Sequence, residues 1–210
     1  NPVSQKIKWE LPIFDNLVGA PLIINNTVFL TSNRTQRNKG APTLYAYDLN
    51  GRAIFIKDFE RENNNQSVFI DILEEYSTIS NDASSILLSF NKIQGKKENF
   101  MELALINTKT GEPVWTSKKI KLSFRSNNDV MLINNGNTEL LLLILNEDII
   151  ALDNKTGEKV WHNNFPNSLV SKSDNQTILV YNRAEKSGSF WDPVSQEEIY
   201  NISHKSDLID

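Results

Sequence analysis

The 210-residue sequence contains no cysteine, and its only histidines are His162 and His204. Without thiols the chain has no disulfide, no thiolate nucleophile and no cysteine-ligated zinc or iron–sulfur site. No stretch approaches the roughly 18 consecutive apolar residues of a membrane span, and the first residues lack the apolar segment of a secretory signal peptide. We therefore expect no membrane span, no metal site and no cofactor.

The sequence also has no large excess of acidic or basic residues. The 22 basic and 26 acidic residues give a net charge of −4, and the two signs are interspersed along the chain. Proteins that bind nucleic acid concentrate Lys and Arg on one face, so we predict no nucleic-acid partner. One local basic cluster is interpreted as a solvated strand edge, with contact to an anionic partner as the alternative; it comprises Lys118, Lys119, Lys121 and Arg125.

Helical periodicity is almost absent, and short apolar runs separated by polar turns dominate the sequence. The one amphipathic segment, "SVFIDILEEYS", starts with β-branched and aromatic residues and is therefore predicted to be a strand. Four other segments predict strand–turn–strand units, with Asn, Asp or Gly where a turn needs positive φ or side-chain bonds to the backbone. They are "PLIINNTVFLTSN", "TISNDASSILLSFN", "DVMLINNGNTELLLLIL" and "LVSKSDNQTILVYN".

A second kind of hairpin recurs along the chain. In "ALDNKTGEKVW" an apolar strand meets a polar turn and a second strand that ends in tryptophan, and "LINTKTGEPVW" follows the same plan. The aromatic endings are spaced by 46, 60, 46 and 39 residues: Trp9, Phe55, Trp115, Trp161 and Tyr200. This is the period of a four-stranded propeller blade, with one insertion that we assign to the polar loop 91–99.

The turns of these hairpins share a chemistry. Asp153 is placed to accept hydrogen bonds from turn amides, Thr156 adds a hydroxyl, and Gly157 can take the left-handed conformation that ends the loop. The matching residues of the earlier turns are Asn107, Thr110 and Gly111, and, one residue shorter, Asp48 and Gly51. The last turn, "DPVSQEE", has Gln196 at the glycine position, so we predict a different or looser turn there.

These residues resemble the tryptophan-docking motif of PQQ-like β-propeller repeats. The third hairpin matches the motif completely, with Ala151, Asp153, Thr156, Gly157 and Trp161. The second departs from it with Leu105 and Asn107, the first ends in Phe55, and the last is a weak match. The resemblance implies that the aromatic residues lock neighbouring blades together. It also implies a scaffold similar to BamB rather than a dehydrogenase, because the dehydrogenases carry adjacent cysteines over their quinone.

The expected architecture is one all-β domain spanning 1–210, built from about four blades of four antiparallel strands. The approximate units are 12–59, 60–119, 120–165 and 166–204, with 5–11 as an outer strand of a preceding blade. Roughly ten residues follow Tyr200, enough for one short strand. We therefore expect a partial or incomplete ring, with its open edge covered by another chain, a missing part of this one or a second copy.

Other candidate residues receive structural interpretations. His162 is predicted to be an exposed residue at a strand end, and Asp71, Glu74 and Glu75 to form a solvated acidic patch. The "DNKTGE" turn lacks the alternating acids of a calcium loop. Four aromatic residues are expected to pack in the core or between blades, with a sugar-binding surface as the alternative; they are Tyr45, Tyr47, Phe190 and Trp191.

The functional expectation follows from the fold and the resemblance. We expect a non-catalytic scaffold that holds a protein partner, or associates with itself, through an open strand edge or through the loops between blades. The resemblance implies an extracytoplasmic location: periplasm, cell surface or secretory lumen. The alternatives are a ligand- or carbohydrate-sensing propeller and a fragment of a quinone-dependent dehydrogenase.

Overall fold

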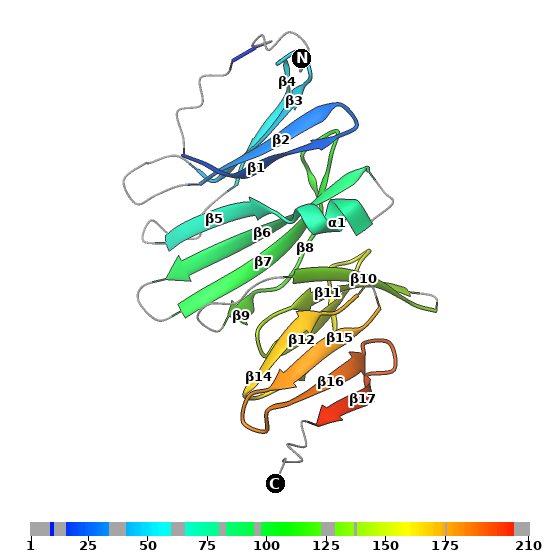
Figure 1. Cartoon of the computed structure of the whole chain (residues 1–210). Helices are drawn as coiled ribbons and strands as arrows, with labels where there is room; N and C mark the ends of the chain where they lie inside the picture. The colour runs from blue at the N-terminus through cyan, green and yellow to red at the C-terminus, as the bar shows by residue number, and fades with distance from the viewer. Residues whose placement is uncertain are drawn as a thin grey trace. The chain divides into compact units, whose positions relative to one another are not determined.

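The structure is a computed structural model, and Figure 1 shows that its ordered elements are nearly all β-strands. The residues that it describes are 9–10, 16–33, 41–59, 66–79, 83–94, 98–122, 129–136, 138–174 and 176–203. They form four antiparallel sheets of strands that are consecutive in sequence. No sheet in these ranges combines strands from the two ends of the chain. The prediction of all-β, propeller-type blades with four antiparallel strands is confirmed.

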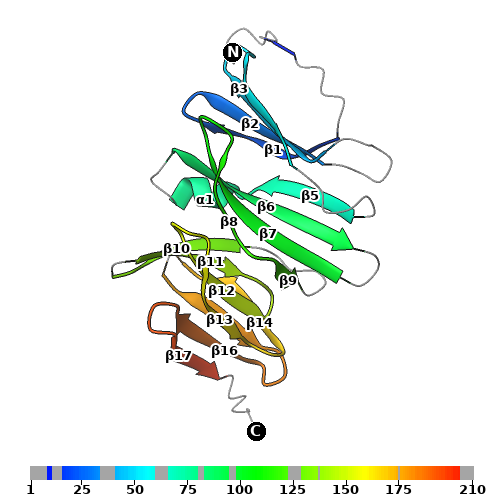
Figure 2. The ribbon, with the colours of Figure 1, turned by 180° about the vertical axis from the view of Figure 1, so that it is seen from behind.

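The chain divides into two compact units, Asn1–Leu122 and Ser123–Asp210, which we call unit 1 and unit 2. Each unit holds two sheets. Sheet A of unit 1 comprises β1 (Asn16–Ile24), β2 (Thr27–Asn33), β3 (Thr43–Asp48) and β4 (Ala53–Asp58). Sheet B comprises β5 (Gln66–Ile72), β6 (Ser85–Gln94), β7 (Glu98–Asn107), β8 (Pro113–Thr116) and β9 (Ile120–Leu122), and Figure 2 shows β5–β8 side by side.

Unit 2 repeats this plan. Sheet C comprises β10 (Asp129–Asn135), β11 (Thr138–Ile144), β12 (Asp148–Asp153) and β13 (Lys159–Asn164). Sheet D comprises β14 (Ser168–Lys172), β15 (Ile178–Asn182), β16 (Ser187–Asp192) and β17 (Glu197–Ser203).

Each unit has an apolar core between its two sheets, because alternate residues of a strand point to the same face. In unit 1, Phe29 and Leu44 of sheet A pack with Ile70 and Leu88 of sheet B, and all four side chains are buried. In unit 2 the core draws on Leu142 and Ala151 from sheet C and on Val180 and Trp191 from sheet D; these residues are also buried.

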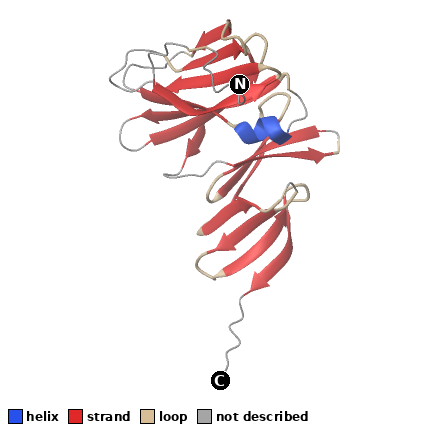
Figure 3. Cartoon of the chain, turned by 45° about the horizontal axis from the view of Figure 1, so that its top comes forward, coloured by secondary structure: helices blue, strands red, loops and turns tan. Residues whose placement is uncertain are grey.

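One part of the strand prediction is wrong. The segment "SVFIDILEEYS" ends its strand at Ile72, and Glu74–Ile79 forms the helix α1, the only helix in the described residues (Figure 3). Glu74 and Glu75 occupy the first helical turn, where the helix dipole favours acidic residues. Tyr76 is buried. A helix of six residues is too short to show the periodicity that sequence analysis relies on.

The long interval between Phe55 and Trp115 also has a different cause from the one predicted. Residues 91–99 were assigned to a polar loop, but the ten-residue strand β6 runs to Gln94 and the ten-residue strand β7 begins at Glu98 opposite it, while residues 95–97 lie outside the described residues. The hairpin also contains a charged pair: Lys92 on β6 is buried, and its Nζ lies 2.6 Å from Oε2 of Glu102 on β7. The extra length lies in this long hairpin and in α1.

Candidate interaction surface

The last two strands of each sheet are joined by the turn that the repeats predicted. In sheet C the Asp153 carboxylate accepts hydrogen bonds from the backbone N–H groups of Lys155 at 2.8 Å and Thr156 at 2.9 Å. The Gly157 N–H donates to the Asp153 carbonyl at 2.8 Å, and Gly157 has a φ of 71°. The side chain therefore closes the loop and glycine ends it.

Sheets A and B have the same chemistry in their turns. The Asn107 side-chain oxygen accepts from the N–H groups of Lys109 at 2.9 Å and Thr110 at 3.2 Å. In the shorter turn of sheet A the Asp48 carboxylate accepts from Asn50 at 2.8 Å and Arg52 at 2.9 Å. Both turns end in glycine with positive φ, 73° at Gly111 and 81° at Gly51.

The prediction of a looser turn in sheet D is wrong. The Gln196 N–H donates to the Asp192 carbonyl at 2.8 Å, and the Asp192 carboxylate accepts from the Val194 N–H at 2.8 Å. Gln196 adopts the left-handed conformation itself, with a φ of 60°. For a residue with a Cβ that conformation costs about 1–2 kcal/mol. The hydrogen bonds of the turn are kept, and the backbone carries the strain.

The four aromatic residues after these turns occupy one register position. Each lies opposite the residue that precedes an irregularity in the ladder: Phe55 opposite Ala46, Trp115 opposite Leu105, Trp161 opposite Ala151 and Tyr200 opposite Phe190. Each aromatic side chain is therefore presented on the same face of its own sheet. We call these residues the register aromatics.

In unit 1 two aromatic rings rest directly on turn glycines. A Cβ added to Gly111 would lie 2.7 Å from Cδ2 of Phe55, and one added to Gly51 would lie 2.8 Å from Cγ of Trp9. The Trp9 indole N–H also donates to the Leu49 carbonyl at 3.0 Å. Both glycines are thus required twice, once for positive φ and once for the close approach of a ring.

In unit 2 the junction between sheets C and D is built differently. Trp161 meets Trp191 edge to face, with ring centroids 5.8 Å apart, and Phe165 meets Trp191 at 5.6 Å. Such tilted aromatic pairs are favourable arrangements. The turn of sheet D has Gln196 where the other turns have glycine, so a Cβ stands where a ring would otherwise rest. Trp161 is partly buried, and Trp115 is buried as predicted.

Tyr200 differs from the other register aromatics because 63% of its surface is exposed. It lies on the face of sheet D that points away from the core. The residues paired across the four strands of the sheet share this face. The apolar members of this face are partly or largely exposed: Leu169, Leu179, Tyr181, Phe190, Tyr200 and Ile202. We call this surface the D face.

Sheet A has a comparable face on the side away from its core. Its apolar members follow from the strand register and are Ile23, Val28, Leu30, Tyr45, Tyr47 and Ile56. We call this surface the A rear face. Ile23 and Ile56 are exposed, while the Trp9 ring lies 6.4 Å from that of Tyr47.

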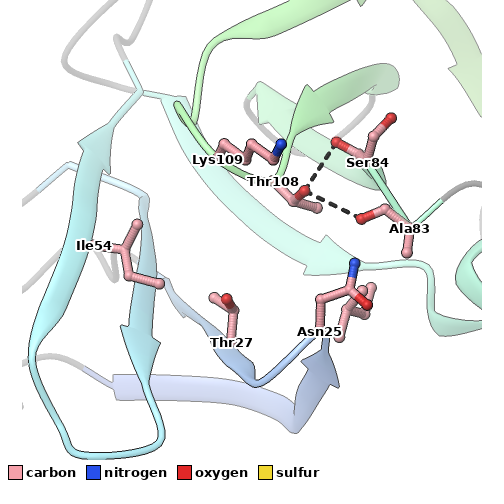
Figure 4. Close-up of a pocket in the computed structure, with 8 residues that line it drawn as sticks. Asn25, Thr27, Ile54, Ala83, Ser84, Thr108 and Lys109 are labelled. Carbon is pink, nitrogen blue, oxygen red and sulfur yellow. Dashed lines mark hydrogen bonds between the residues drawn. The ribbon is translucent and has the colours of Figure 1, made fainter.

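An open groove of about 520 Å³ lies in unit 1, beside the β1–β2 and β7–β8 turns (Figure 4). Asn25 and Asn26 form the first turn with positive φ. The Thr108 hydroxyl in the groove is already engaged with the carbonyl oxygens of Ala83 at 3.2 Å and Ser84 at 2.9 Å. The Thr108 hydroxyl therefore links the β7–β8 turn to the segment that precedes β6.

A smaller crevice of about 220 Å³ lies between the outer strands of sheets A and B. Lys57 bonds Glu112 across it at 2.8 Å, and the Lys92–Glu102 pair lies deeper. The Phe59 and Phe90 rings close it edge to face at 4.8 Å. Both lysines that line the crevice have a carboxylate partner, and the Lys57–Glu112 pair joins sheet A to sheet B.

The remaining candidates lie apart from one another. His162 is exposed, as predicted, but lies within β13 and not at a strand end, and its Nε2 lies 2.7 Å from Oδ1 of Asp148. Burial raises the pKa of the Asp71 carboxyl, with the Ile72 N–H opposing this effect and Glu74 adding to it. Tyr47 and Trp191 are buried, as the packing interpretation requires, whereas Tyr45 and Phe190 are only half-buried.

The basic cluster is exposed at Lys118, Lys119 and Lys121, while Arg125 and His204 lie outside the described residues, as do most of residues 5–11. In the part of the chain that the structure describes, no three His, Cys, Asp or Glu side chains gather as a metal site. No helix of that part is long and apolar enough to cross a membrane.

Comparison with known proteins supports the fold at low sequence identity. No family model and no curated protein matches the sequence. A quinohemoprotein alcohol dehydrogenase from Pseudomonas putida is similar over 88% of this chain and 34% of its own, with 11% identity and a TM-score of 0.50. The chain thus spans about a third of the length of that enzyme.

Two further solved structures are similar. A protein of unknown function from Bacteroides caccae matches 96% of this chain and 66% of its own, with 11% identity and a TM-score of 0.45. The WD40 domain of SCAP from fission yeast matches 85% and 42%, with 10% identity and a TM-score of 0.44. The structural neighbours are β-propeller proteins, and the four sheets of this chain are β-propeller blades.

Proposed function

We propose that this chain is a non-catalytic β-propeller scaffold with PQQ-like repeats that binds a protein through the D face. The observation that carries the proposal is the exposure of Tyr200. Phe55 and Trp161, at the same register position, each contact the following sheet of their unit, whereas Tyr200 is 63% exposed. A sheet face that presents two tyrosines and several aliphatic side chains to water is typical of a protein-binding surface.

The PQQ-like part of the proposal is supported by the contacts between rings and glycines. Trp9 on Gly51 and Phe55 on Gly111 repeat one arrangement, in which a ring covers a turn that ends with positive φ. We assign the same structural docking role to Trp115 and Trp161 and to their turns. The role is to fix the spacing between neighbouring blades, so these residues support the scaffold without touching a substrate.

The proposal includes the absence of catalysis and an extracytoplasmic location. The chain has no cysteine, so it cannot form the disulfide of adjacent cysteines that PQQ-like dehydrogenases place over their cofactor. Reconstitution with pyrroloquinoline quinone and calcium, assayed with an alcohol and a dye acceptor, is expected to give no turnover above the blank. Turnover would favour the dehydrogenase alternative. Fractionation of the native host tests the location.

The binding role is tested with matched variants of the strand β17. Tyr200→Ser removes the most exposed aromatic residue of the D face, whereas Ile199→Ser removes a similarly exposed residue, at 61%, from the irregularity beside it. In affinity capture from the native host, a partner that binds the D face is lost with Tyr200→Ser and retained with Ile199→Ser. Capture that is identical for both variants and the unmodified chain would contradict the proposal.

A further inference from the structure

Contacts between sheets within each unit follow one rule. The face that carries the register aromatic packs on the opposite kind of face of the next sheet. Sheet A presents Phe55 and Leu44 to sheet B, and sheet C presents Trp161 and Ala151 to the Trp191 side of sheet D. A surface that bears a register aromatic is thus complementary to a surface that bears none.

Each unit leaves two outer sheet faces, and only two of these four faces expose large apolar side chains in the described residues, since Trp115 and Leu143 on the outer faces of sheets B and C are buried. The D face bears the exposed register aromatic Tyr200, and the A rear face bears none. The A rear face also belongs to a sheet whose turn ends in Gly51, a glycine that has positive φ and lies under a ring, as Gly111 does under Phe55. The D face therefore supplies a register aromatic, and the A rear face supplies a glycine turn of the kind that contacts such a ring.

We infer that the D face docks on the A rear face of a second copy of the chain, with Tyr200 taking the place on Gly51 that Trp9 holds in the single copy. The inference rests on the proposed function, because it names the protein that binds the D face. It continues the interface already present between sheets A and B and between sheets C and D. Docking of two D faces on each other has no counterpart in the chain and would leave Tyr200 without a glycine turn, since Gln196 replaces the glycine of sheet D.

Trp9 acts as a plug in this arrangement. Its ring is held against Gly51, its N–H is bonded to the Leu49 carbonyl, and it lies beside Tyr47. A ring from another copy cannot enter until Trp9 leaves, because a turn glycine accommodates one ring. Ile23 and Ile56 stay exposed on the same face, so removal of the plug completes an apolar receiving surface. The contact is head to tail, which allows further copies to add.

Sedimentation velocity of the full chain over a range of concentrations tests both parts. Trp9→Ala is expected to tighten self-association about tenfold, and Tyr200→Ser to weaken it about tenfold, the size expected for a tyrosine that anchors an interface. Ile199→Ser, the control on β17, should match the unmodified chain. Circular dichroism verifies that each variant is folded. A chain that stays monomeric with Trp9→Ala, or that associates equally with Tyr200→Ser, overturns the inference.

Crosslinking in the Trp9→Ala background, in which the receiving surface is free, then identifies the two surfaces. Because the chain has no cysteine, single-cysteine variants are unambiguous. A mixture of Ile202→Cys and Ile56→Cys chains should form mixed disulfide dimers under mild oxidation, and neither variant should dimerise efficiently alone. Efficient homodimers of Ile202→Cys would show two D faces docked together and overturn the head-to-tail contact.

The two proposals fail in different ways. If the chain does not associate with itself but Tyr200→Ser still loses a partner that Ile199→Ser retains, the second copy is the wrong occupant and the scaffold function stands. If Tyr200→Ser changes neither self-association nor capture from the native host, both proposals are wrong.

Discussion

The two junctions between sheets, one in each unit, solve the same packing problem with different residues. In unit 1 the Phe55 ring lies directly against Gly111, so the backbone of the next sheet contacts the ring. In unit 2, Trp161 contacts the side chain of Trp191, and the turn of sheet D carries Gln196. The first junction requires a residue without Cβ at Gly111. The second accommodates the Cβ of Gln196, because the Trp161 ring contacts the Trp191 ring instead of the turn.

The comparison shows that the turn and the docking site are separable. All four turns keep the acid or amide that bonds the loop, and all four end in a residue with positive φ. Only the turns that receive a ring in the described contacts, those of Gly51 and Gly111, need glycine for the space it leaves as well. A Gln at this position therefore strains the backbone without destroying the turn.

The largest effect is expected when the aromatic itself is removed. Phe55→Ala and Trp161→Ala should each lower the free energy of unfolding by about 3 kcal/mol, through lost burial and the cavity left behind. Denaturant unfolding gives the loss, and hydrogen exchange of peptides from each unit shows where it falls. Phe55→Ala should act on unit 1 and Trp161→Ala on unit 2. A loss below about 1 kcal/mol at either junction would show that its ring does not hold the sheets together.

The next effect separates ring contact from backbone strain. Gly111→Ala should cost about 2–4 kcal/mol, because positive φ disfavours alanine and its Cβ would meet the Phe55 ring. The control is Gly136→Ala in the β10–β11 turn. Gly136 also has positive φ, at 68°, but a Cβ there meets nothing within 4 Å, so only about 1–2 kcal/mol should be lost. Equal losses in denaturant unfolding would contradict a role for the Phe55 contact.

A smaller effect of opposite sign is expected at the other junction. Gln196→Gly relieves the left-handed strain and should stabilise unit 2 by about 0.5–1 kcal/mol, the relief being partly offset by the greater freedom of glycine in the unfolded chain. The melting temperature measures the gain. If the substitution destabilises the protein, the Gln196 side chain contributes more to this junction than its backbone costs.

The smallest effect is a difference in pH dependence between the units. Burial raises the pKa of Asp71 in unit 1 above its ordinary value of 3.8. A carboxyl with a higher pKa in the folded chain binds more protons when folded, so unit 1 loses stability as pH rises from 3.8 through the folded pKa. Asp71→Asn should remove this loss, as measured by hydrogen exchange of unit 1 between about pH 4 and pH 6.

Asp174 in unit 2 is expected to change stability with pH in the opposite direction to Asp71. The backbone N–H of Gln176, followed by Thr177, lowers its pKa below 3.8, against the effect of burial. Its contribution is present above pH 3.8 and is lost as pH falls through the folded pKa. Asp174→Asn should therefore change how the stability of unit 2 falls at acid pH, and should not affect the stability of unit 1. A pH dependence that is unchanged by either substitution would contradict these assignments.

The blades could be predicted because their signals are local. The acid or amide at the start of the turn, the glycine at its end and the aromatic four residues later fix a hairpin within about a dozen residues. The Gln196 turn was misjudged because sequence shows the loss of glycine but not that the Asp192 hydrogen bonds hold the backbone in place. Helix α1 was missed because six residues carry too little pattern.

The D face could not be predicted in the same way. Leu169, Tyr181 and Ile202 look like ordinary strand residues, and which face of a strand is covered depends on the neighbouring sheet. The one signal was Tyr200 at the aromatic position of a weak repeat. The contact of Trp9 with Gly51 joins residues 42 positions apart in the sequence, so the motif indicated a docking aromatic without indicating its turn.

The order of the strands has a consequence for how the chain reaches its structure. Every sheet is made from neighbouring strands joined by hairpins, so most contacts form between residues close in sequence and the contact order is low for an all-β protein. Folding can therefore proceed sheet by sheet as the chain is synthesised. The last 88 residues, those of unit 2, take on the order of 10 s to translate. Unit 1 has that interval in which to fold before unit 2 is complete, which shortens the exposure of apolar strands to misassembly on the ribosome.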